Sequence, residues 1–318
     1  MESDIHRLLT VFRGGRADRV PNFEIVIDRR NLRAILGREP SENSLWTIPP
    51  AEAVEVALRV RQDAIPCPLQ SPLPPGSVTE QSDPADLPRP EVSGKREKLQ
   101  AYLEAVRGTG LGVCPCLSGP FTASSLTCGP VSIQSFLEMI YTAPRVVEAV
   151  MDYYTEYTLA ALRAIGDLPY HFLYLGDDVT DFVSPEHLAA LWAPRHERII
   201  RAAQETGRPI LCHCCGPQAD VLPYFERWGV EAAHPLQADR NDIFAVRERY
   251  PDLTLVGNVD VNLLSFGTPD AVAAATLERL ERLGRAGRYV VCSSHSIIDS
   301  VRPENYRAMI ETAWHWRA

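Results

Sequence analysis

The chain has 318 residues, of which 45% are hydrophobic and 23% charged, as in an ordinary globular protein. Its net charge of −9 and its lack of a Lys/Arg run argue against nucleic-acid binding. Residues 1–20 contain no apolar h-region of a signal peptide, and no apolar run is long enough to cross a bilayer. We therefore expect a cytoplasmic protein whose eight cysteines stay reduced.

Short apolar runs alternate with longer amphipathic runs along the whole chain. The alternation predicts an α/β protein, and eight strands followed by helices favour a single (β/α)8 TIM barrel domain over residues 1–318. A doubly wound open sheet is the alternative, although no GxGxxG or P-loop motif supports a nucleotide-binding version of it. The predicted strands are Asn22–Ile27, Ala64–Cys67, Gly112–Leu117, His171–Gly176, Pro209–Cys214, Glu231–Pro235, Thr254–Val259 and Tyr289–Cys292. The predicted helices are Pro144–Ile165, Ser184–Thr206, Gly216–Trp228, Asp242–Tyr250, Thr268–Leu283 and Pro303–Trp316.

One segment is too long for a plain connection in a minimal barrel. Residues Pro66–Pro90, after the second predicted strand, are dense in proline and also contain serine and aspartate. Long loops of this kind often cover a functional site, and a surface insertion without function is the other interpretation.

In a TIM barrel, the active site lies at the carboxyl ends of the strands. The polar and sulfur-bearing residues of this chain gather at those predicted ends, which favours a site there. They are Glu24, Cys67, Cys116, Asp177, Asp178, His213, Cys215, His234, Asn258, Asp260, Cys292 and His295.

The segment Pro209–Gly216 carries the strongest chemical signal. An apolar strand delivers His213 and Cys215 on one face, because successive side chains of a strand alternate, and Cys212 and Cys214 on the other. An imidazole and a thiolate together are half of a zinc site, and catalytic zinc takes three protein ligands and keeps one open position.

The third ligand should come from another strand end. Tyr289–His295 offers Cys292 or His295, and the spacing does not separate them. Cys212 and Cys214 are expected to be small buried side chains, and the single histidines His171 and His234 are expected to be structural.

Three carboxylates complete the candidate site. Asp177 and Asp178 follow an apolar strand and are candidates for acid–base chemistry, substrate orientation or a metal ligand, while one of them is expected to cap local structure. Glu24 lies inside an apolar strand, where an unpaired carboxylate is costly, so we expect it to pair with a metal, an arginine or a substrate group.

An ordered set of motifs resembles the uroporphyrinogen decarboxylase superfamily. The motifs run through nearly the whole chain and imply a (β/α)8 barrel. They are Arg16-Ala-Asp-Arg-Val-Pro21, Gly119-Pro-Phe-Thr122, Leu175-Gly-Asp-Asp178 with Ser184-Pro-Glu186, Gly257-Asn-Val-Asp260 with Gly267-Thr-Pro269, and Ser294-His-Ser-Ile297 with Pro303-Glu-Asn305.

The resemblance also separates two branches of this superfamily. Uroporphyrinogen decarboxylases carry an Arg-Gln-Ala-Gly-Arg run near the first strand, where this chain reads Asn22–Arg30 and has an acid at Glu24. A site with few cations would bind a polycarboxylate porphyrinogen poorly. The other branch contains zinc-dependent methyltransferases with a His-x-Cys motif, which His213-Cys-Cys215 matches.

The resemblance therefore implies a zinc-dependent methyltransferase that acts with a corrinoid protein. It would move a methyl group between methylcobalamin on that separate partner and a small thiol, folate, methoxy or methylamine compound. No corrinoid-binding Asp-x-His-x-x-Gly motif is present in this chain. The alternatives are a decarboxylase, for which Arg29 and Arg30 are the nearby cations, and a non-catalytic corrinoid- or tetrapyrrole-binding protein.

Overall fold

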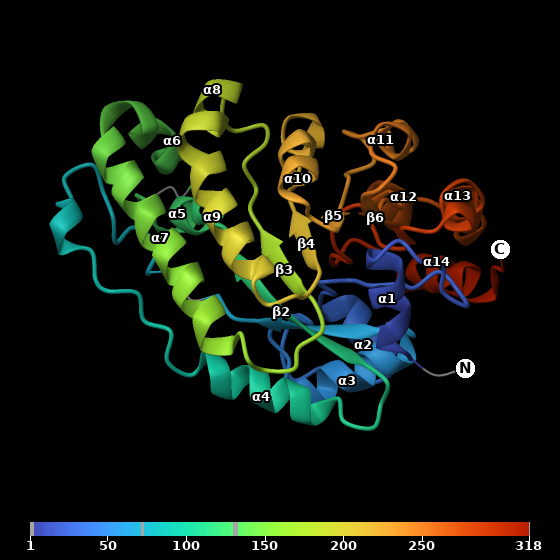
Figure 1. The fold of residues 1–318 in the computed structure, drawn as a ribbon. Helices are drawn as coiled ribbons and strands as arrows, with labels where there is room; N and C mark the ends of the chain where they lie inside the picture. The colour runs from blue at the N-terminus through green and yellow to red at the C-terminus, as the bar shows by residue number, and fades with distance from the viewer. Residues whose placement is uncertain (1–2, 71–72, 130–132, 318) are drawn as a thin grey trace.

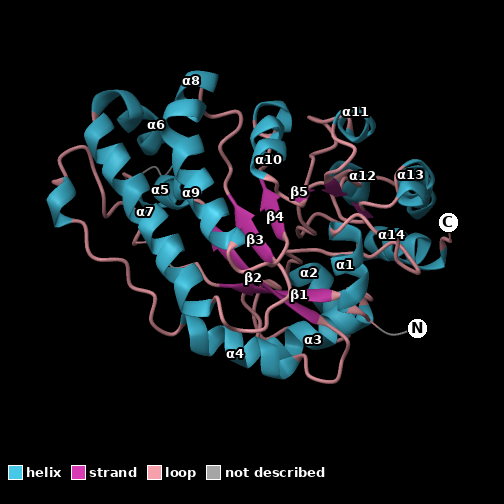
Figure 2. Ribbon diagram, viewed as in Figure 1, coloured by secondary structure: helices cyan, strands magenta, loops and turns pink. Residues whose placement is uncertain are grey.

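The computed structural model describes residues 3–70, 73–129 and 133–317, and its centre is a parallel β-sheet (Figure 2). Seven strands pair in sequence order, each parallel to the next. They are β1 (Ala64–Pro68), β2 (Gly112–Ser118), β3 (Leu173–Gly176), β4 (Ile210–His213), β5 (Ala232–His234), β6 (Thr254–Val256) and β7 (Tyr289–Val290). The predicted α/β class and seven of the eight predicted strands are confirmed.

The first predicted strand is wrong as a regular strand. Within Asn22–Ile27 only isolated parallel bridges form, Asn22 to Val291 and Ile27 to Ile297. On the side toward β1, the side chain of Gln62 takes the place of the backbone hydrogen bonds that a neighbouring strand would make. It accepts from the Glu24 N–H at 3.2 Å and donates to the Glu24 carbonyl at 3.4 Å. The segment thus lies beside β7, in the position of the predicted strand, without joining the sheet as a strand.

Helices surround the sheet on its outer side (Figure 1). The α-helices are α1 (Ile5–Phe12), α2 (Arg29–Leu36), α3 (Pro50–Arg59), α4 (Lys95–Ala105), α5 (Pro120–Thr127), α6 (Ile133–Thr142), α7 (Pro144–Ile165), α8 (Pro185–His187), α9 (Ala193–Gln204), α10 (Leu222–Trp228), α11 (Ile243–Arg249), α12 (Val261–Phe266), α13 (Pro269–Arg282) and α14 (Pro303–His315). Short 3₁₀ turns lie at η1 (Pro84–Asp86), η3 (Gln218–Asp220) and η4 (Gly284–Ala286). Among the described residues, no helix is both long and apolar enough to cross a membrane.

The predicted helix Ser184–Thr206 is interrupted by a wider turn. Ser184 caps its start by accepting from the His187 N–H, and the following proline suits the first turn. Residues Leu188–Trp192 then form a π-helical turn, η2, before α9 begins. π-turns inside helices are rare and often lie at functional sites.

Two apolar clusters separate the inside of the curved sheet from its outside. The inner cluster takes side chains from every strand, including Cys116, Tyr174 and Leu211, together with Phe172 just before β3 and Phe23 from the first segment. Phe12 of α1 packs edge-on against Phe172 at 5.1 Å between ring centroids, so α1 covers the amino end of this interior. The outer cluster fills the layer between the strands and the helices.

The proline-rich segment after β1 packs against α5, α6 and α7. The Leu73 N–H donates to the Tyr154 hydroxyl at 2.8 Å, and the Gly76 N–H donates to the Thr127 carbonyl at 3.0 Å. The Thr142 hydroxyl donates to Glu80 at 2.5 Å. Residues 71–72 of the predicted segment Pro66–Pro90 lie outside the described residues.

Candidate metal centre

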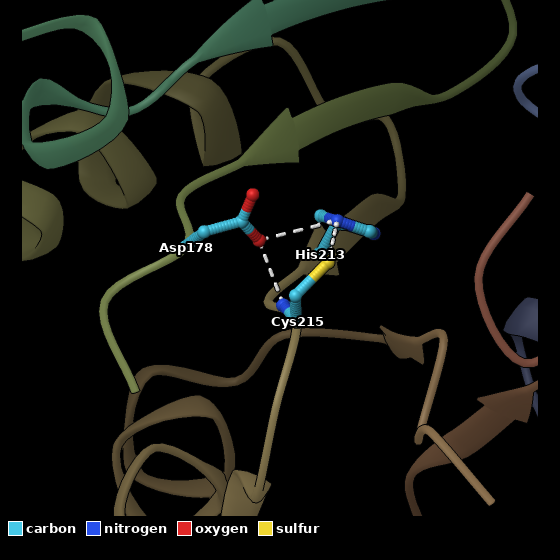
Figure 3. Close-up of side chains that lie close together, drawn as sticks. All are labelled: Asp178, His213 and Cys215. Carbon is cyan, nitrogen blue, oxygen red and sulfur yellow. Dashed lines mark hydrogen bonds and ion pairs between the residues drawn. The ribbon is translucent and has the colours of Figure 1, made fainter. Parts of the chain in front are cut away.

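Three donor side chains meet at the carboxyl ends of β3 and β4 (Figure 3). Asp178 lies two residues after β3, His213 ends β4, and Cys215 follows two residues later. His213 Nε2 lies 3.2 Å from Cys215 Sγ and 3.3 Å from Asp178 Oδ1. The cluster is reachable, because the Asp178 side chain is 36% exposed and that of His213 is 11% exposed.

Backbone contacts hold these donors in place. The Asp178 N–H donates to the Thr122 hydroxyl at 2.7 Å, which ties the turn after β3 to α5. The Cys215 N–H donates to Asp178 Oδ1 at 2.7 Å, which ties the end of β4 to the same carboxylate. The site is therefore built by the strand ends and one helix start.

The electrostatics of the cluster favour a cation. Burial, the largest influence on Asp178, acts to raise its pKa, but the charge of His213 and the hydrogen bonds from His213 and Cys215 outweigh it and lower the pKa. Burial and then the Asp178 charge raise the pKa of the Cys215 thiol. A bound cation would lower the pKa of the Cys215 thiol, because it stabilises the thiolate beside the carboxylate.

The donor set also fits the dimensions of zinc. With ligand distances of roughly 2.0 Å for nitrogen and oxygen and 2.3 Å for sulfur, donors around tetrahedral zinc lie about 3.3–3.6 Å apart. The two separations from His213 Nε2, 3.2 Å and 3.3 Å, are close to this range. Three protein donors would leave one position open, as in catalytic sites.

A second set of polar contacts runs from His213 across the interior to the first segment. His213 Nδ1 lies 2.6 Å from His234 Nδ1, and His234 Nε2 lies 3.3 Å from Cys292 Sγ. Cys292 Sγ in turn donates to Glu24 Oε2 at 3.4 Å. The parallel register explains the first contact, since His213 and His234 are paired neighbours on β4 and β5.

These contacts place the two predicted ligands from the last strand. Cys292 is fully buried, and His234 lies between it and His213. His295 is partly exposed. Burial and then the charge of His213 lower its pKa, which indicates that it lies near the same cluster. Neither residue belongs to the three-donor cluster, and a metal bond to either stays a prediction.

Sequence reasoning missed His234, which it assigned to a structural role. The available signal was strand parity, because Ala232 and His234 face the same side of β5 and Ala232 packs in the inner cluster. Burial and then the charges of His213 and His295 lower the pKa of His234 well below its usual value, so this imidazole is neutral.

The carboxylate of Glu24 is bonded by Ser293 and Cys292. It is 1% exposed and accepts from the Ser293 N–H at 2.6 Å and the Ser293 hydroxyl at 2.8 Å, besides the Cys292 thiol. Burial raises its pKa to about 7, and the bonds from Ser293 limit that rise. A backbone amide, a hydroxyl and a thiol satisfy this carboxylate, and its bonds among the described residues include no arginine, while a metal or a substrate group as its partner stays a prediction.

Asp177 points away from the three donors. Its carboxylate accepts from the Thr122 N–H at 2.7 Å and from Trp192 Nε1–H at 2.9 Å, and His196 lies 3.5 Å away. The adjacent carboxylates thus separate, with Asp178 at the cluster and Asp177 joining α5 to η2.

Other candidates at the strand ends are occupied elsewhere. Cys212 and Cys214 are fully buried in the outer cluster, as their strand parity predicts. Cys67 and Cys116 are also buried, Asn258 donates to the Leu236 carbonyl, and Asp260 caps α12.

Arg29 pairs with Glu39 at 3.1 Å, and Arg30 bonds to the Asp299 carbonyl at 3.3 Å, both at the surface. The two arginines that the decarboxylase alternative offered are therefore engaged away from the cluster.

Comparison with known proteins identifies the family. The family model described as uroporphyrinogen decarboxylase (URO-D) matches residues 48–316. The chain belongs to the uroporphyrinogen decarboxylase family. The matched range contains Asp178, His213 and Cys215, whereas Glu24 precedes it.

Two relatives of this URO-D family member are methyltransferases by name. A methylated-thiol–coenzyme M methyltransferase from Methanosarcina mazei is 24% identical over 247 residues, which are 74% of this chain and 64% of that protein. The structure of a methyltransferase from Methanosarcina mazei aligns over 98% of both chains with a TM-score of 0.73 and 18% identity. The second match shows that the fold is shared, and the resemblance to this family is confirmed.

Proposed function

We propose that this URO-D family member is a zinc-dependent methyltransferase that moves a methyl group between a corrinoid on a separate protein and a small acceptor or donor. The observation that carries the proposal is the cluster of Asp178 Oδ1, His213 Nε2 and Cys215 Sγ. The curated relative supports the reaction class, since its name describes methyl transfer between sulfur compounds. The corrinoid partner comes from the sequence resemblance.

In this proposal Asp178, His213 and Cys215 hold the metal. Zinc at that position would favour the thiolate form of a sulfur substrate, or act as a Lewis acid on a methoxy, methylamine or folate group. The chain also supplies an aromatic wall. The ring of Tyr174 lies 5.5 Å from that of His213, and Trp46 packs edge-on against Tyr174 at 6.5 Å.

The remaining carboxylates have supporting roles in this scheme. Asp177 fixes the turn that presents Asp178, because it joins α5 and η2 beside that turn. Glu24 lies behind Cys292 and does not reach the three donors. A closed structural zinc site would need a fourth protein donor, and the cluster has three, which favours catalysis over a purely binding role.

The test measures metal content and methyl transfer together. We expect protein purified without chelator to hold one zinc ion, and His213→Ala and Cys215→Ala to lose it. Cys214→Ala is the matched control, because this neighbouring thiol is buried in the outer cluster and should leave zinc bound. Methylcobalamin serves as the donor, with coenzyme M and 2-mercaptoethanol as acceptors.

Two results would contradict the proposal. The first is a native protein without metal, or one whose metal survives both substitutions. The second is zinc-loaded protein that transfers no methyl group in either direction with any of the thiol, methoxy, methylamine and folate compounds. Release of CO₂ from a carboxylated substrate by the protein without zinc would instead support the decarboxylase alternative.

A further inference from the structure

Hydrogen bonds link His213 to Glu24 through His234 and Cys292. The donor in each bond can be deduced by starting from Glu24. Glu24 Oε1 and Oε2 accept from the backbone amide and the hydroxyl of Ser293. Above its pKa of about 7, Glu24 is ionised and has no hydrogen to donate, so at about pH 8 the 3.4 Å contact requires the Cys292 thiol to donate to Glu24. Burial and the Glu24 charge raise the pKa of this thiol well above its usual value, so it keeps the hydrogen that it donates.

The remaining hydrogens follow from this first one. The Cys292 thiol has one hydrogen and donates it to Glu24. The 3.3 Å contact with His234 therefore requires His234 Nε2–H to donate to the sulfur. At about pH 8 an imidazole carries one ring hydrogen, so Nδ1 of His234 has none and accepts from His213 Nδ1–H at 2.6 Å. His213 is then left with no hydrogen on Nε2, the atom that lies 3.3 Å from Asp178 Oδ1 and 3.2 Å from Cys215 Sγ. The hydrogen bond from His213 that lowers the Asp178 pKa belongs to the protonated imidazolium, which carries a hydrogen on both nitrogens.

We propose that His234, Cys292 and Glu24 are positioning residues that act in series to fix the tautomer and the ring orientation of His213, so that its Nε2 lone pair is presented to the metal. The inference rests on the proposed metal centre and extends it to residues that touch no metal. It also assigns Cys292 a role as a hydrogen-bond link. Groups that orient a metal-ligating histidine through its second nitrogen commonly change metal affinity by about 10–100-fold when they are removed.

The hydrogen-bond path from His213 through His234 and Cys292 to Glu24 is suited to this role because it is buried. His234, Cys292 and Glu24 are each at most 1% exposed, so water does not compete for their hydrogen bonds. The path also joins separate parts of the chain, since His234 ends β5, Cys292 follows β7 and Glu24 belongs to the first segment. Its length explains how a residue outside the matched family range bears on the cluster.

The first test observes the tautomers directly in metal-free protein. Protein labelled with ¹⁵N-histidine is studied at about pH 8 by long-range ¹⁵N–¹H correlation, since the two neutral tautomers have distinct nitrogen signals. We expect the Nδ1–H form for His213 and the Nε2–H form for His234. His171 is an internal reference for the Nε2–H form, because its Nδ1 accepts from the Val113 N–H at 3.0 Å. An Nε2–H form of His213 would overturn the inference.

The second test measures zinc affinity by competition with a chelator. His234→Leu removes the acceptor for His213, and we expect affinity to fall about 10–100-fold. His234→Asn keeps an oxygen near the position of Nδ1, and we expect affinity within about threefold of the native value. Cys292→Ala should weaken binding, whereas Cys292→Ser, which can both accept and donate, should restore it. His171→Gln is the control for replacing a partly buried histidine elsewhere.

The outcomes separate this inference from the proposed function. If native protein binds zinc through His213 and Cys215 while His234→Leu binds it equally well, the inference is wrong and the proposed metal centre stands. If native protein binds no zinc, the metal centre is wrong, and the tautomer experiment still decides whether the hydrogen-bond order is correct. A variant that fails to fold is recognised by its circular dichroism, and the native tautomers then carry the test.

Discussion

The buried carboxyl group of Glu24 should make the stability of this protein depend on pH. Its pKa rises from an ordinary value of 4.5 to about 7 because it is buried. The folded protein therefore keeps a proton that the unfolded chain releases, and the free energy of unfolding falls as pH rises through that window. With roughly 1.4 kcal/mol per pKa unit, we expect Glu24 to lower the free energy of unfolding by about 2.5 kcal/mol between pH 5 and pH 8.

Glu24→Gln isolates this contribution, since it keeps the shape of the side chain and removes its titration. Urea unfolding of metal-free native and variant protein at both pH values gives a double difference in which other titrating groups cancel. We expect native protein to lose about 2.5 kcal/mol more than the variant on going from pH 5 to pH 8. Glu304→Gln, at an exposed position, should show no such difference. Equal pH dependence of native and Glu24→Gln protein would refute the reasoning.

Three further predictions concern the turn after β3 and the thiol at the cluster. Asp177→Asn turns an amide N–H toward the donors from Thr122 and Trp192, so the free energy of unfolding should fall by about 1–3 kcal/mol in urea titrations. Gly119→Ala should cost roughly 1–3 kcal/mol, because the added Cβ overlaps the Asp177 carboxylate; a variant as stable as native protein would contradict this. In metal-free protein a thiol reagent should modify Cys215 first, since the other seven cysteines are buried. Zinc should protect that thiol, and a fast reaction that survives Cys215→Ala would show that another cysteine is accessible.

The face of a strand on which a residue lies, and the position at which a strand ends, could be predicted from the sequence because both are local properties. The alternation of side chains placed His213 and Cys215 on one face and Cys212 and Cys214 in the outer cluster. The position of Asp178 two residues after an apolar strand also indicated a group at the carboxyl edge. Each of these needs only a few consecutive residues.

Contacts across the interior could not be read in this way. The distance between β4 and β7 depends on the curvature of the whole sheet, so the sequence did not show that His234 would lie between His213 and Cys292. The irregular first segment was also hidden. Its pattern is that of a strand, but the side chain of Gln62, 38 positions away, bonds the backbone groups that a ladder would use.

The π-turn at Leu188–Trp192 gives this protein a sensitivity to deletion that point substitutions do not test. A π-turn holds one residue more than the α-helical turn it replaces. Because each residue of an α-helix advances it by about 100°, removing one residue here would rotate everything on one side of the turn relative to the other. Trp192 would then point away from Asp177, and the indole hydrogen bond would be lost while the helix itself could remain intact. Asp177 would then keep the Thr122 N–H as a donor without the indole.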